Sequence, residues 1–260
     1  MNCSNFFHDK TIVVTGASSG IGKNIALNIA RNNARLIMIS KDEDKLEEAR
    51  LEITKITNNK EIKAICCDLS AKKSLQKCIK TISDLDSRVY GLVNNAAINP
   101  SREDISGTKE SDWTDIINTN LTGVFQLTKG MIQLMRKNNI GCIVNISSIA
   151  GINGMKNRFS YSVTKSALIG FTNSIAADFS KKNIRVNTIC PGYVKTPLTE
   201  KFLNNLSETD LLELKEKHPL KGFGDTQDIA NIVDFLLSEK SGWITGAIIP
   251  VDGGYSIGRD

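Results

Sequence analysis

Short apolar segments alternate with helical segments along almost the whole chain, and this alternation restricts the fold more than any other feature. The apolar segments have the length and β-branched content of strands: they span Thr11–Thr15, Arg35–Ser40, Ile62–Cys67, Tyr90–Asn94, Gly141–Ile146, Arg185–Cys190 and Ala247–Val251. Segments with helical periodicity lie between most of them, at Ile21–Asn32, Glu43–Thr57, Ala71–Leu85, Trp113–Asn138, Tyr161–Ser180 and Thr226–Leu237. Strands without a polar face are typical of parallel sheets covered by helices on both sides.

Strands joined through helices predict βαβ units, whose crossovers are right-handed in nearly all proteins. No repeat, low-complexity tract or Pro/Gly-rich linker interrupts the pattern over the 260 residues. We therefore predict an α/β fold in one domain, residues 1–260. Its expected core is a doubly wound, Rossmann-type parallel sheet of about seven strands with helices on both faces.

A glycine-rich turn joins the first predicted strand to the first helix. Thr15–Gly22 reads TGASSGIG, in the order strand, turn, helix. In that context Gly16, Gly20 and Gly22 permit a tight turn, close approach of a pyrophosphate and packing of the helix on the strand. The free N–H groups of the helix start would face the phosphates. The turn predicts a dinucleotide site.

Tyr161 and Lys165 lie four residues apart in a predicted helix, and therefore on one face of it. A phenol has a reference pKa near ~10, and an adjacent ammonium group lowers that pKa towards neutrality. The pair predicts a proton donor for general acid–base chemistry. The spacing alone also fits a half-buried tyrosine beside a solvated lysine, so the other motifs have to decide.

Charge and apolar content exclude two classes of function. The net charge is +5, but basic residues alternate with acidic ones, as in Lys41–Lys45, and none gather with aromatics into a strip. Nucleic-acid binding is therefore not predicted. No apolar run reaches the ~20 residues of a membrane span, and the first residues lack a signal peptide's basic and apolar regions. We expect no membrane insertion and a cytoplasmic location.

Neither the cysteines nor the histidines show metal-ligand spacing. The two histidines, His8 and His218, have no ligand partner nearby in sequence, so no metal site is expected. Without CxxC spacing, the cysteines are predicted to be free and mostly buried thiols: Cys3, Cys66, Cys67, Cys78, Cys142 and Cys190. Trp113 and Trp243 are interpreted as packing residues.

Seven motifs, in order, resemble the short-chain dehydrogenase/reductase family over essentially the full length. They are TGASSGIG at 15–22, NNAA at 94–97, NLTGVF starting at Asn120, Ser148 thirteen residues before the tyrosine, the Tyr161/Lys165 pair, PGYVKT at 191–196 and VDGG at 251–254. The one visible departure is Ala97, where the family has glycine.

The resemblance implies a role for each polar residue of these motifs. Tyr161 would donate a proton to a carbonyl oxygen, or accept one from an alcohol, and Ser148 would hydrogen-bond the same oxygen. Lys165 would lower the pKa of the tyrosine and bind the nicotinamide ribose. Asn120 would hold a water that links Lys165 to solvent.

Plainer interpretations remain open for three residues. Ser148 also fits an ordinary turn serine, and Asn120 fits a helix-kink residue whose amide satisfies a backbone group. Asp68, taken as a contact of the adenine edge, also fits a cap of the next helix.

The resemblance implies a cofactor site built from the following residues: Gly16, Ser18, Ser19, Gly20, Ile21, Gly22, Ser40, Lys41, Asp68, Leu69, Asn94, Ala96, Tyr161, Lys165, Pro191, Gly192, Val194 and Thr196. NAD sites of this type place an acid at the end of the second strand, where it binds the ribose 2′-hydroxyl. Here Ser40 and Lys41 follow that strand, and Asp42 is interpreted as the cap of the next helix. Lys41 offers a cation to a 2′-phosphate, so we predict NADP(H) over NAD(H). A solvated loop lysine is the alternative, and Ser19 replaces a basic residue common in NADP enzymes.

The predicted function is an NADP(H)-dependent oxidoreductase that interconverts a small-molecule ketone or aldehyde and its alcohol. The chain is similar to 3-oxoacyl-[acyl carrier protein] reductases, so reduction of a 3-oxoacyl group on a carrier protein or CoA is the leading substrate hypothesis. A sugar, a polyol or a small ketone is the alternative. Ala177 precedes Asp178 where carrier-protein reductases tend to have a basic residue, which weakens the carrier hypothesis.

Two further expectations concern the lid and the assembly. Residues 196–220 are predicted to form a helical substrate lid with an apolar underside: Leu198, Phe202, Leu203, Leu206, Leu211, Leu212 and Leu214. The resemblance implies a homotetramer or dimer, with the helices at Trp113–Asn138 and Tyr161–Ser180 in one interface. A catalytically retired dinucleotide-binding sensor or structural protein is the alternative of another class. Such a protein would be free to lose the catalytic residues, whereas all four are present here: Asn120, Ser148, Tyr161 and Lys165.

Overall fold

The computed structural model describes residues 6–220 and 222–257, in which seven strands form one sheet. The strands are β1 Thr11–Thr15, β2 Arg35–Ser40, β3 Ile62–Cys66, β4 Val89–Asn94, β5 Gly141–Ile146, β6 Ile184–Pro191 and β7 Ile248–Val251. Their order is β3-β2-β1-β4-β5-β6-β7, and every pair is parallel. The strand order reverses between β1 and β4, which confirms the predicted doubly wound sheet.

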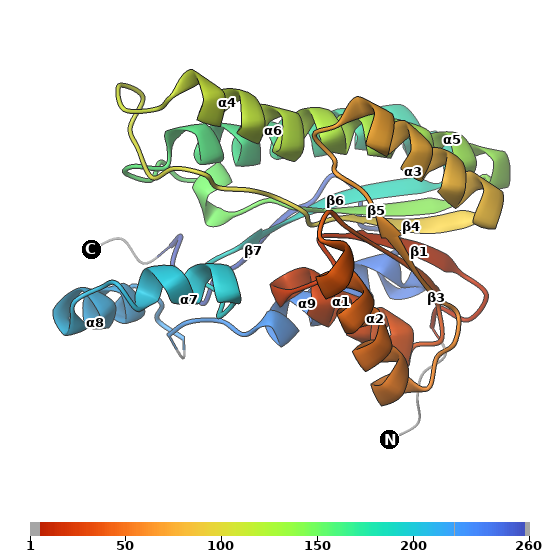
Figure 1. The fold of residues 1–260 in the computed structure, drawn as a ribbon, viewed down its shortest axis with the longest axis horizontal. Coiled ribbons are helices and arrows are strands. Elements are labelled where there is room, and N and C mark those ends of the chain that lie inside the picture. The colour runs from red at the N-terminus through yellow and green to blue at the C-terminus, as the bar shows by residue number, and fades with distance from the viewer. Residues whose placement is uncertain (1–5, 221, 258–260) are drawn as a thin grey trace.

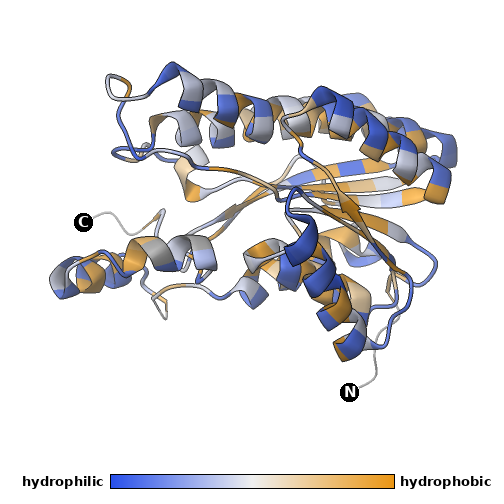
Figure 2. Ribbon diagram, in the orientation of Figure 1, coloured by the Kyte–Doolittle hydropathy of each residue, from blue (hydrophilic) through white to orange (hydrophobic). Residues whose placement is uncertain are grey.

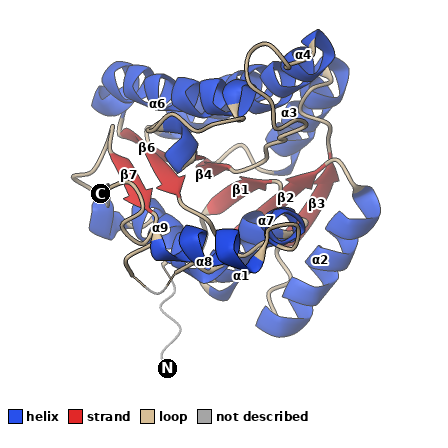
Figure 3. Cartoon of the chain, turned by 90° about the vertical axis from the view of Figure 1, so that its left-hand side faces the viewer, coloured by secondary structure: helices blue, strands red, loops and turns tan. Residues whose placement is uncertain are grey.

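Two layers of helices cover the sheet (Figure 1). One layer holds α1 Gly20–Arg31, α2 Glu43–Thr57 and α9 Thr226–Leu237. The other holds α3 Lys72–Leu85, α4 Glu110–Ile117, α5 Val124–Asn138 and α6 Phe159–Phe179. Two short helices, α7 Pro197–Leu203 and α8 Glu208–Glu216, follow β6 and stand apart from both layers (Figures 1 and 3).

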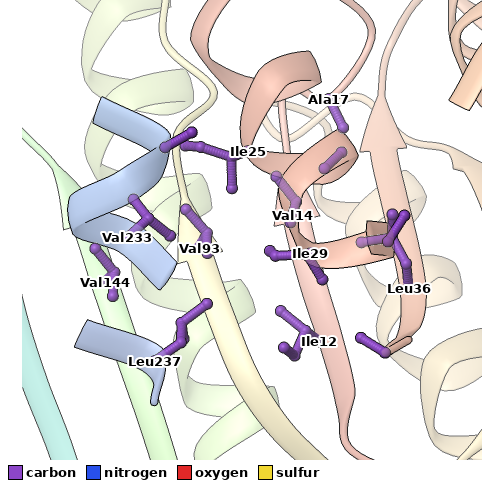
Figure 4. Packing of buried hydrophobic residues seen from close by; sticks show 14 of the residues in the cluster. Ile12, Val14, Ala17, Ile25, Ile29, Leu36, Val93, Val144, Val233 and Leu237 are labelled. Atoms are coloured by element: carbon purple, nitrogen blue, oxygen red, sulfur yellow. The ribbon is translucent and has the colours of Figure 1, made fainter. Parts of the chain in front are cut away.

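Both faces of the sheet are apolar, because successive side chains of a strand point to opposite faces. Ile12 and Val14 of β1 pack against α1 and α9, whereas Val13 belongs to the core beneath α3 and α5. Figure 4 shows the first of these cores, where Ile25 and Val233 meet the sheet. Complete burial of such a side chain contributes about 1.5–3 kcal/mol. Figure 2 shows the corresponding pattern, with apolar strands and helices that are polar on the outside.

Two predicted helices differ from the structure. The segment predicted as one helix at Trp113–Asn138 begins at Glu110 and contains a π-helical segment, Asn118–Gly123, between α4 and α5. The predicted lid is two helices, because α7 ends at Leu203 and α8 begins only after the Ser207 cap. Of the predicted apolar underside, Leu212 is exposed, and the side chain of Leu198 lies outside the described residues.

The expectations for the cysteines and tryptophans are met in part. Cys67, Cys78, Cys142 and Cys190 are free and buried and Cys66 is free but exposed, while Cys3 lies outside the described residues. Trp113 stacks on Phe159 with ring centroids 5.8 Å apart. The packing interpretation of Trp243 is wrong for the chain, since this side chain is 100% exposed. Within residues 6–220 and 222–257, no helix combines the length and apolar character of a bilayer span.

Candidate active site

A cleft of about 610 Å³ lies at the carboxyl ends of the strands. Its walls come from the glycine-rich turn, the ends of β2 to β6, and the first turns of α6 and α7. Ligands of open parallel sheets bind at this edge, where the strand order reverses. A second depression, of about 700 Å³, lies between α3 and α5 and contains none of the predicted site residues.

The glycine-rich turn brings the backbone of α1 close to β1. Gly16 has φ +64° and Gly20 has φ +54°, the left-handed region that favours glycine. A Cβ on Gly22 would lie 2.2 Å from the carbonyl oxygen of Gly16, so no side chain fits there. The cap residue Ser19 forms no side-chain hydrogen bond to the helix start, and the first turn holds no acid. The first N–H groups of α1 are therefore able to receive an anion.

Thr15 fixes the loop after β4 across the floor of the cleft. Its hydroxyl accepts from the N–H groups of Asn95 at 2.9 Å and of Ala96 at 3.0 Å. The Asn95 amide in turn donates to the Thr15 carbonyl oxygen at 2.9 Å. Asn95, Ala96 and Ala97 consequently line the cleft beside the glycine-rich turn.

The ends of β2 and β3 form the far end of the cleft. Ser40 and Ser18 share a hydrogen bond of 3.0 Å between their hydroxyl groups. Asp42 caps α2 by accepting from the N–H of Lys45 at 3.1 Å, and its carboxylate forms an ion pair with the Lys45 ammonium at 2.8 Å. Lys41 lines the cleft, and no carboxylate of the described residues forms an ion pair with it.

Asp68 lies in the turn after β3 rather than at the cap of α3, which is Ala71. Its carboxylate accepts from the N–H and the hydroxyl of Ser70, at 2.8 and 2.7 Å. These hydrogen bonds lower the pKa of Asp68 against the effect of burial. Asp68 and Leu69 both line the cleft, so the helix-cap interpretation of Asp68 is wrong.

Ser148, Tyr161 and Lys165 meet at the base of the cleft. Ser148 caps a 3-10 turn, Ile149–Gly151, by accepting from the Ala150 N–H at 3.1 Å. This turn packs on α6, which carries the tyrosine and the lysine. Lys165 is 3% exposed, and its ammonium donates to the Ile146 carbonyl oxygen at 2.8 Å. The Lys165 nitrogen lies 5.6 Å from the centre of the Tyr161 ring.

Burial dominates the pKa values of this group. It raises the pKa of Tyr161, while the hydrogen bond to Ser148 and the charge of Arg158 act in the opposite direction. The prediction that the pKa of this phenol is lowered is therefore wrong for this structure, since desolvation disfavours the phenolate. Burial also lowers the pKa of Lys165 to about 8.

Asn120 lies in the π-helical segment, behind the cleft wall. Its amide donates to the Ile98 carbonyl oxygen at 2.9 Å, and its side-chain oxygen accepts from the Ile98 N–H at 2.8 Å. A longer contact of 3.3 Å joins the amide to the Thr164 hydroxyl. The amide therefore satisfies the hydrogen-bonding groups of the Ile98 backbone, in agreement with the plainer interpretation. These two bonds hold Ile98, which lines the cleft, in place.

Of the predicted site residues, all but three line the cleft; these are Asn94, Asn120 and Gly22. Asn94 is buried, and its amide donates to Asn145 at 2.8 Å and to Thr128 at 3.0 Å. Asn94 thus joins β4, β5 and α5 below the site. The prediction missed Lys45, Asn95, Ile98 and Thr199, which also line the cleft. The sequence placed Asn95 inside a motif, but only its side-chain direction shows that it, rather than Asn94, faces the turn.

Comparison with known proteins agrees with this geometry. Residues 16–256 match the model of a family described as enoyl-(acyl carrier protein) reductase. A 3-oxoacyl-[acyl-carrier-protein] reductase of Thermotoga maritima is 33% identical over 248 residues, which are 95% of this chain and 98% of that protein. The chain belongs to the short-chain dehydrogenase/reductase family. As predicted, this short-chain dehydrogenase/reductase is an enzyme, an oxidoreductase of CH–OH or carbonyl groups.

Two solved structures of this family extend the likeness. The crystal structure of levodione reductase is 26% identical, with a TM-score of 0.93 over 97% of this chain and 100% of that one. A structure of ElxO with NADP bound is 32% identical, with a TM-score of 0.87 over 95% of this chain and 98% of that one. Members of the family bind a nicotinamide dinucleotide.

Proposed function

We propose that this short-chain dehydrogenase/reductase reduces a ketone with NADP(H), or oxidises the corresponding alcohol, with Tyr161 as the proton donor or acceptor. The observation that carries the proposal is the grouping of Ser148, Tyr161 and Lys165 in one cleft with the glycine-rich turn. The Ser148 hydroxyl acts on the pKa of Tyr161, so the two hydroxyl groups lie close enough for one substrate oxygen to contact both.

The cleft fits a dinucleotide on observations of the chain itself. Gly16 and Gly20 line the cleft without side chains of their own, and the start of α1 presents free N–H groups to a pyrophosphate. Leu69 and Asp68 line one end, where the adenine would lie, and Pro191 and Gly192 line the other. Bound there, the cofactor supplies or receives the hydride.

The protein's part of the reaction is positioning and proton transfer. In reduction, Ser148 donates a hydrogen bond to the substrate oxygen, and the Tyr161 O–H transfers its proton to that oxygen as the carbonyl carbon receives a hydride. Ketone, NADPH and one proton thus give alcohol and NADP+. Lys165 would bind the ribose hydroxyls of the cofactor through its ammonium group, and its charge would stabilise the tyrosinate that forms. Asn120 supports this wall through Ile98.

Preference for NADP(H) is supported by the end of β2. Ser40 places no negative charge beside the ribose, and Lys41 offers a cation at the cleft that is not engaged by a carboxylate of the described residues. The nearest acid in sequence, Asp42, is held by the start of α2 and by Lys45. A structure of ElxO carries NADP.

For the substrate, we propose a 3-oxoacyl compound as the leading candidate. The 3-oxoacyl reductase relatives, such as the one from Thermotoga maritima, support this choice. Levodione reductase, with the TM-score of 0.93, favours a small ketone as the second candidate. Helices α7 and α8 would act as the lid, since Thr196, Pro197 and Thr199 line the cleft. Assembly into a homotetramer or dimer stays a prediction from the family.

The test is a panel of ketones with NADPH, read at the absorbance of the reduced cofactor, for wild type, Tyr161→Phe and Lys165→Ala. Tyr161→Phe should lose turnover by about a hundred-fold or more while NADPH binding stays nearly intact, because only a hydroxyl is removed. Lys165→Ala should lose both turnover and NADPH binding. Substantial turnover in Tyr161→Phe would contradict the mechanism, and activity confined to NADH would contradict the cofactor.

A further inference from the structure

Two arginines converge on one aromatic ring of helix α7. Arg102 lies in the loop after β4, and Arg158 directly precedes α6. Their guanidinium carbons lie 3.5 Å and 5.7 Å from the centre of the Phe202 ring on α7. The three elements lie on the same side of the molecule (Figure 1). A cation over a ring is an ordinary contact, but two like charges over one ring repel each other.

Among the described residues, no carboxylate neutralises this pair, because neither arginine forms an ion pair. Asp104, two residues after Arg102, is engaged elsewhere, because its carboxylate accepts from the N–H groups of Ser106 and Gly107, at 2.9 and 3.0 Å. In the orientation that satisfies its amide, Asn99 accepts one hydrogen bond from Arg158. The remaining guanidinium donors of the pair have no anionic partner.

The pair is close to the reacting groups. The charge of Arg158 acts on the pKa of Tyr161, three residues further along. Burial lowers the pKa of Arg102, the charge of Arg158 lowers it further, and Tyr193 acts in the opposite direction. Tyr193 follows the cleft-lining Gly192, and its ring lies 6.1 Å from that of Phe202. Arg158 is therefore near both the lid residue Phe202 and the proton donor Tyr161, and Arg102 contacts the same ring.

We propose that Arg102 and Arg158 bind an anionic group of the substrate, so that this enzyme acts on ketones or alcohols that carry a carboxylate or a phosphate. One guanidinium group can donate two parallel hydrogen bonds to two oxygens of a carboxylate or of a phosphate. Phe202 positions the pair from the lid, and binding of the anion removes the repulsion between the two charges. The inference rests on the proposed function and narrows its substrate class.

The anion can belong to either of two kinds of substrate. A carboxylate would belong to a small oxo acid. A phosphate would belong to the long arm of an acyl thioester, as in CoA, whose 3-oxoacyl group is itself uncharged. The recognition chemistry is the same, so the test has one arm for each source.

The first arm compares three oxo acids with their methyl esters as substrates with NADPH: 3-oxobutanoate, 4-oxopentanoate and 5-oxohexanoate. Each pair shares its ketone and differs by one charge. The second arm compares acetoacetyl-CoA with S-acetoacetyl-N-acetylcysteamine, which lacks the phosphates. In at least one arm we expect the charged member to be preferred, and Arg102→Gln and Arg158→Gln to raise its KM by about ten-fold or more. The uncharged member should be unaffected.

Lys156→Gln serves as the matched control, since Lys156 is an exposed cation of the loop before α6. This control variant should leave the KM of both members of each substrate pair unchanged. Equal use of charged and uncharged members in both arms would overturn the inference. An equal loss on both members in the arginine variants would also overturn it, because that is the result of a purely structural contact with the lid.

Failure of the proposed function can be told apart from failure of this inference. If no ketone is reduced, the proposed function is wrong, and the arginines are tested by binding instead. Thermal unfolding of the NADPH-loaded protein is then measured with 5-oxohexanoate, its methyl ester, and inorganic phosphate. A stabilisation by the anions alone that both arginine variants abolish supports the inference, and no difference between anion and ester overturns it.

Discussion

Lys165 shows how far the fold changes a single side chain. Its ammonium group is buried, it donates to the Ile146 carbonyl oxygen, and its pKa is lowered to about 8. A lysine in this environment is close to losing its proton under mildly alkaline conditions. Since the proposed ribose contact uses the charged form, cofactor binding is tied to this titration.

We therefore expect NADPH binding to be strongest below pH 8 and to weaken as the pH rises through about 8 and above, because the ammonium becomes a neutral amine. Cofactor fluorescence titrations across this range measure the effect. Lys165→Met should bind weakly at every pH and show no inflection. A wild-type affinity that stays constant up to pH 10 would contradict the role of this lysine.

In the proposed preference for NADP(H), Lys41 is the residue that would pair with the 2′-phosphate. A charge-assisted hydrogen bond to a phosphate at this partly solvated edge is worth about 1.5 kcal/mol, so Lys41→Ala should weaken NADPH about ten-fold. Binding of NADH should be nearly unchanged, and Ser40→Asp should shift the preference further towards NADH. The ratio of kcat/KM for the two cofactors is the measurement. A wild type that already prefers NADH would refute the assignment.

At the scale of the element, the π-helical segment Asn118–Gly123 interrupts the helix between α4 and α5 and carries the Asn120 side-chain amide. Such segments are often found at functional sites. Here Asn120 in this segment hydrogen-bonds both the N–H and the carbonyl oxygen of Ile98.

Asn120→Ala should lower the free energy of unfolding by about 2 kcal/mol, because two partly buried backbone groups lose their hydrogen bonds. Turnover should fall as well, since Ile98 lines the cleft. Chemical denaturation and steady-state kinetics give the two quantities. Asn118→Ala, in the same segment, is the control and should be close to wild type. Loss of turnover at unchanged stability would instead favour the direct role in proton relay.

At the scale of the whole molecule, helices from opposite ends of the chain pack together. α1 and α9 share the core beneath β1 and β4, where Ile25, Ile29 and Val233 meet. Asp234 of α9 lies in this interface, and one of its carboxylate oxygens is buried without a hydrogen-bond partner. Burial raises the pKa of Asp234 to about 7, against a hydrogen bond from Asn28 of α1.

Between the unfolded pKa of 3.8 and about 7, the folded chain binds this proton and the unfolded chain does not. The stability that the proton contributes is thus fully present at low pH and is lost as the pH rises through about 7. Asp234→Asn should raise the free energy of unfolding at pH 8 by on the order of 1–2 kcal/mol, and this gain should shrink towards pH 5. Chemical denaturation at pH 8 and at pH 5 measures this gain, and Asp178→Asn, at an exposed position, is the control. A gain that does not depend on pH would argue against a buried, protonated Asp234.

The sequence by itself determined the sheet, most helix bounds and many of the residues that line the cleft. Apolar periodicity reports which face of a segment is buried, and the glycines at 16 and 22 mark positions where no Cβ fits. Local patterns of this kind need no knowledge of distant contacts.

Only the tertiary structure decided what depends on neighbours far apart in sequence. The direction of the Tyr161 pKa shift was one such property, since desolvation by the surrounding fold outweighs its local partners. The π-helical turn of Asn120 was another, because its partner Ile98 lies twenty-two residues away. The arginine pair on Phe202 was a third, since it joins three separate elements. Burial, register and charge environment arise when the chain closes on itself, so no local pattern specifies them.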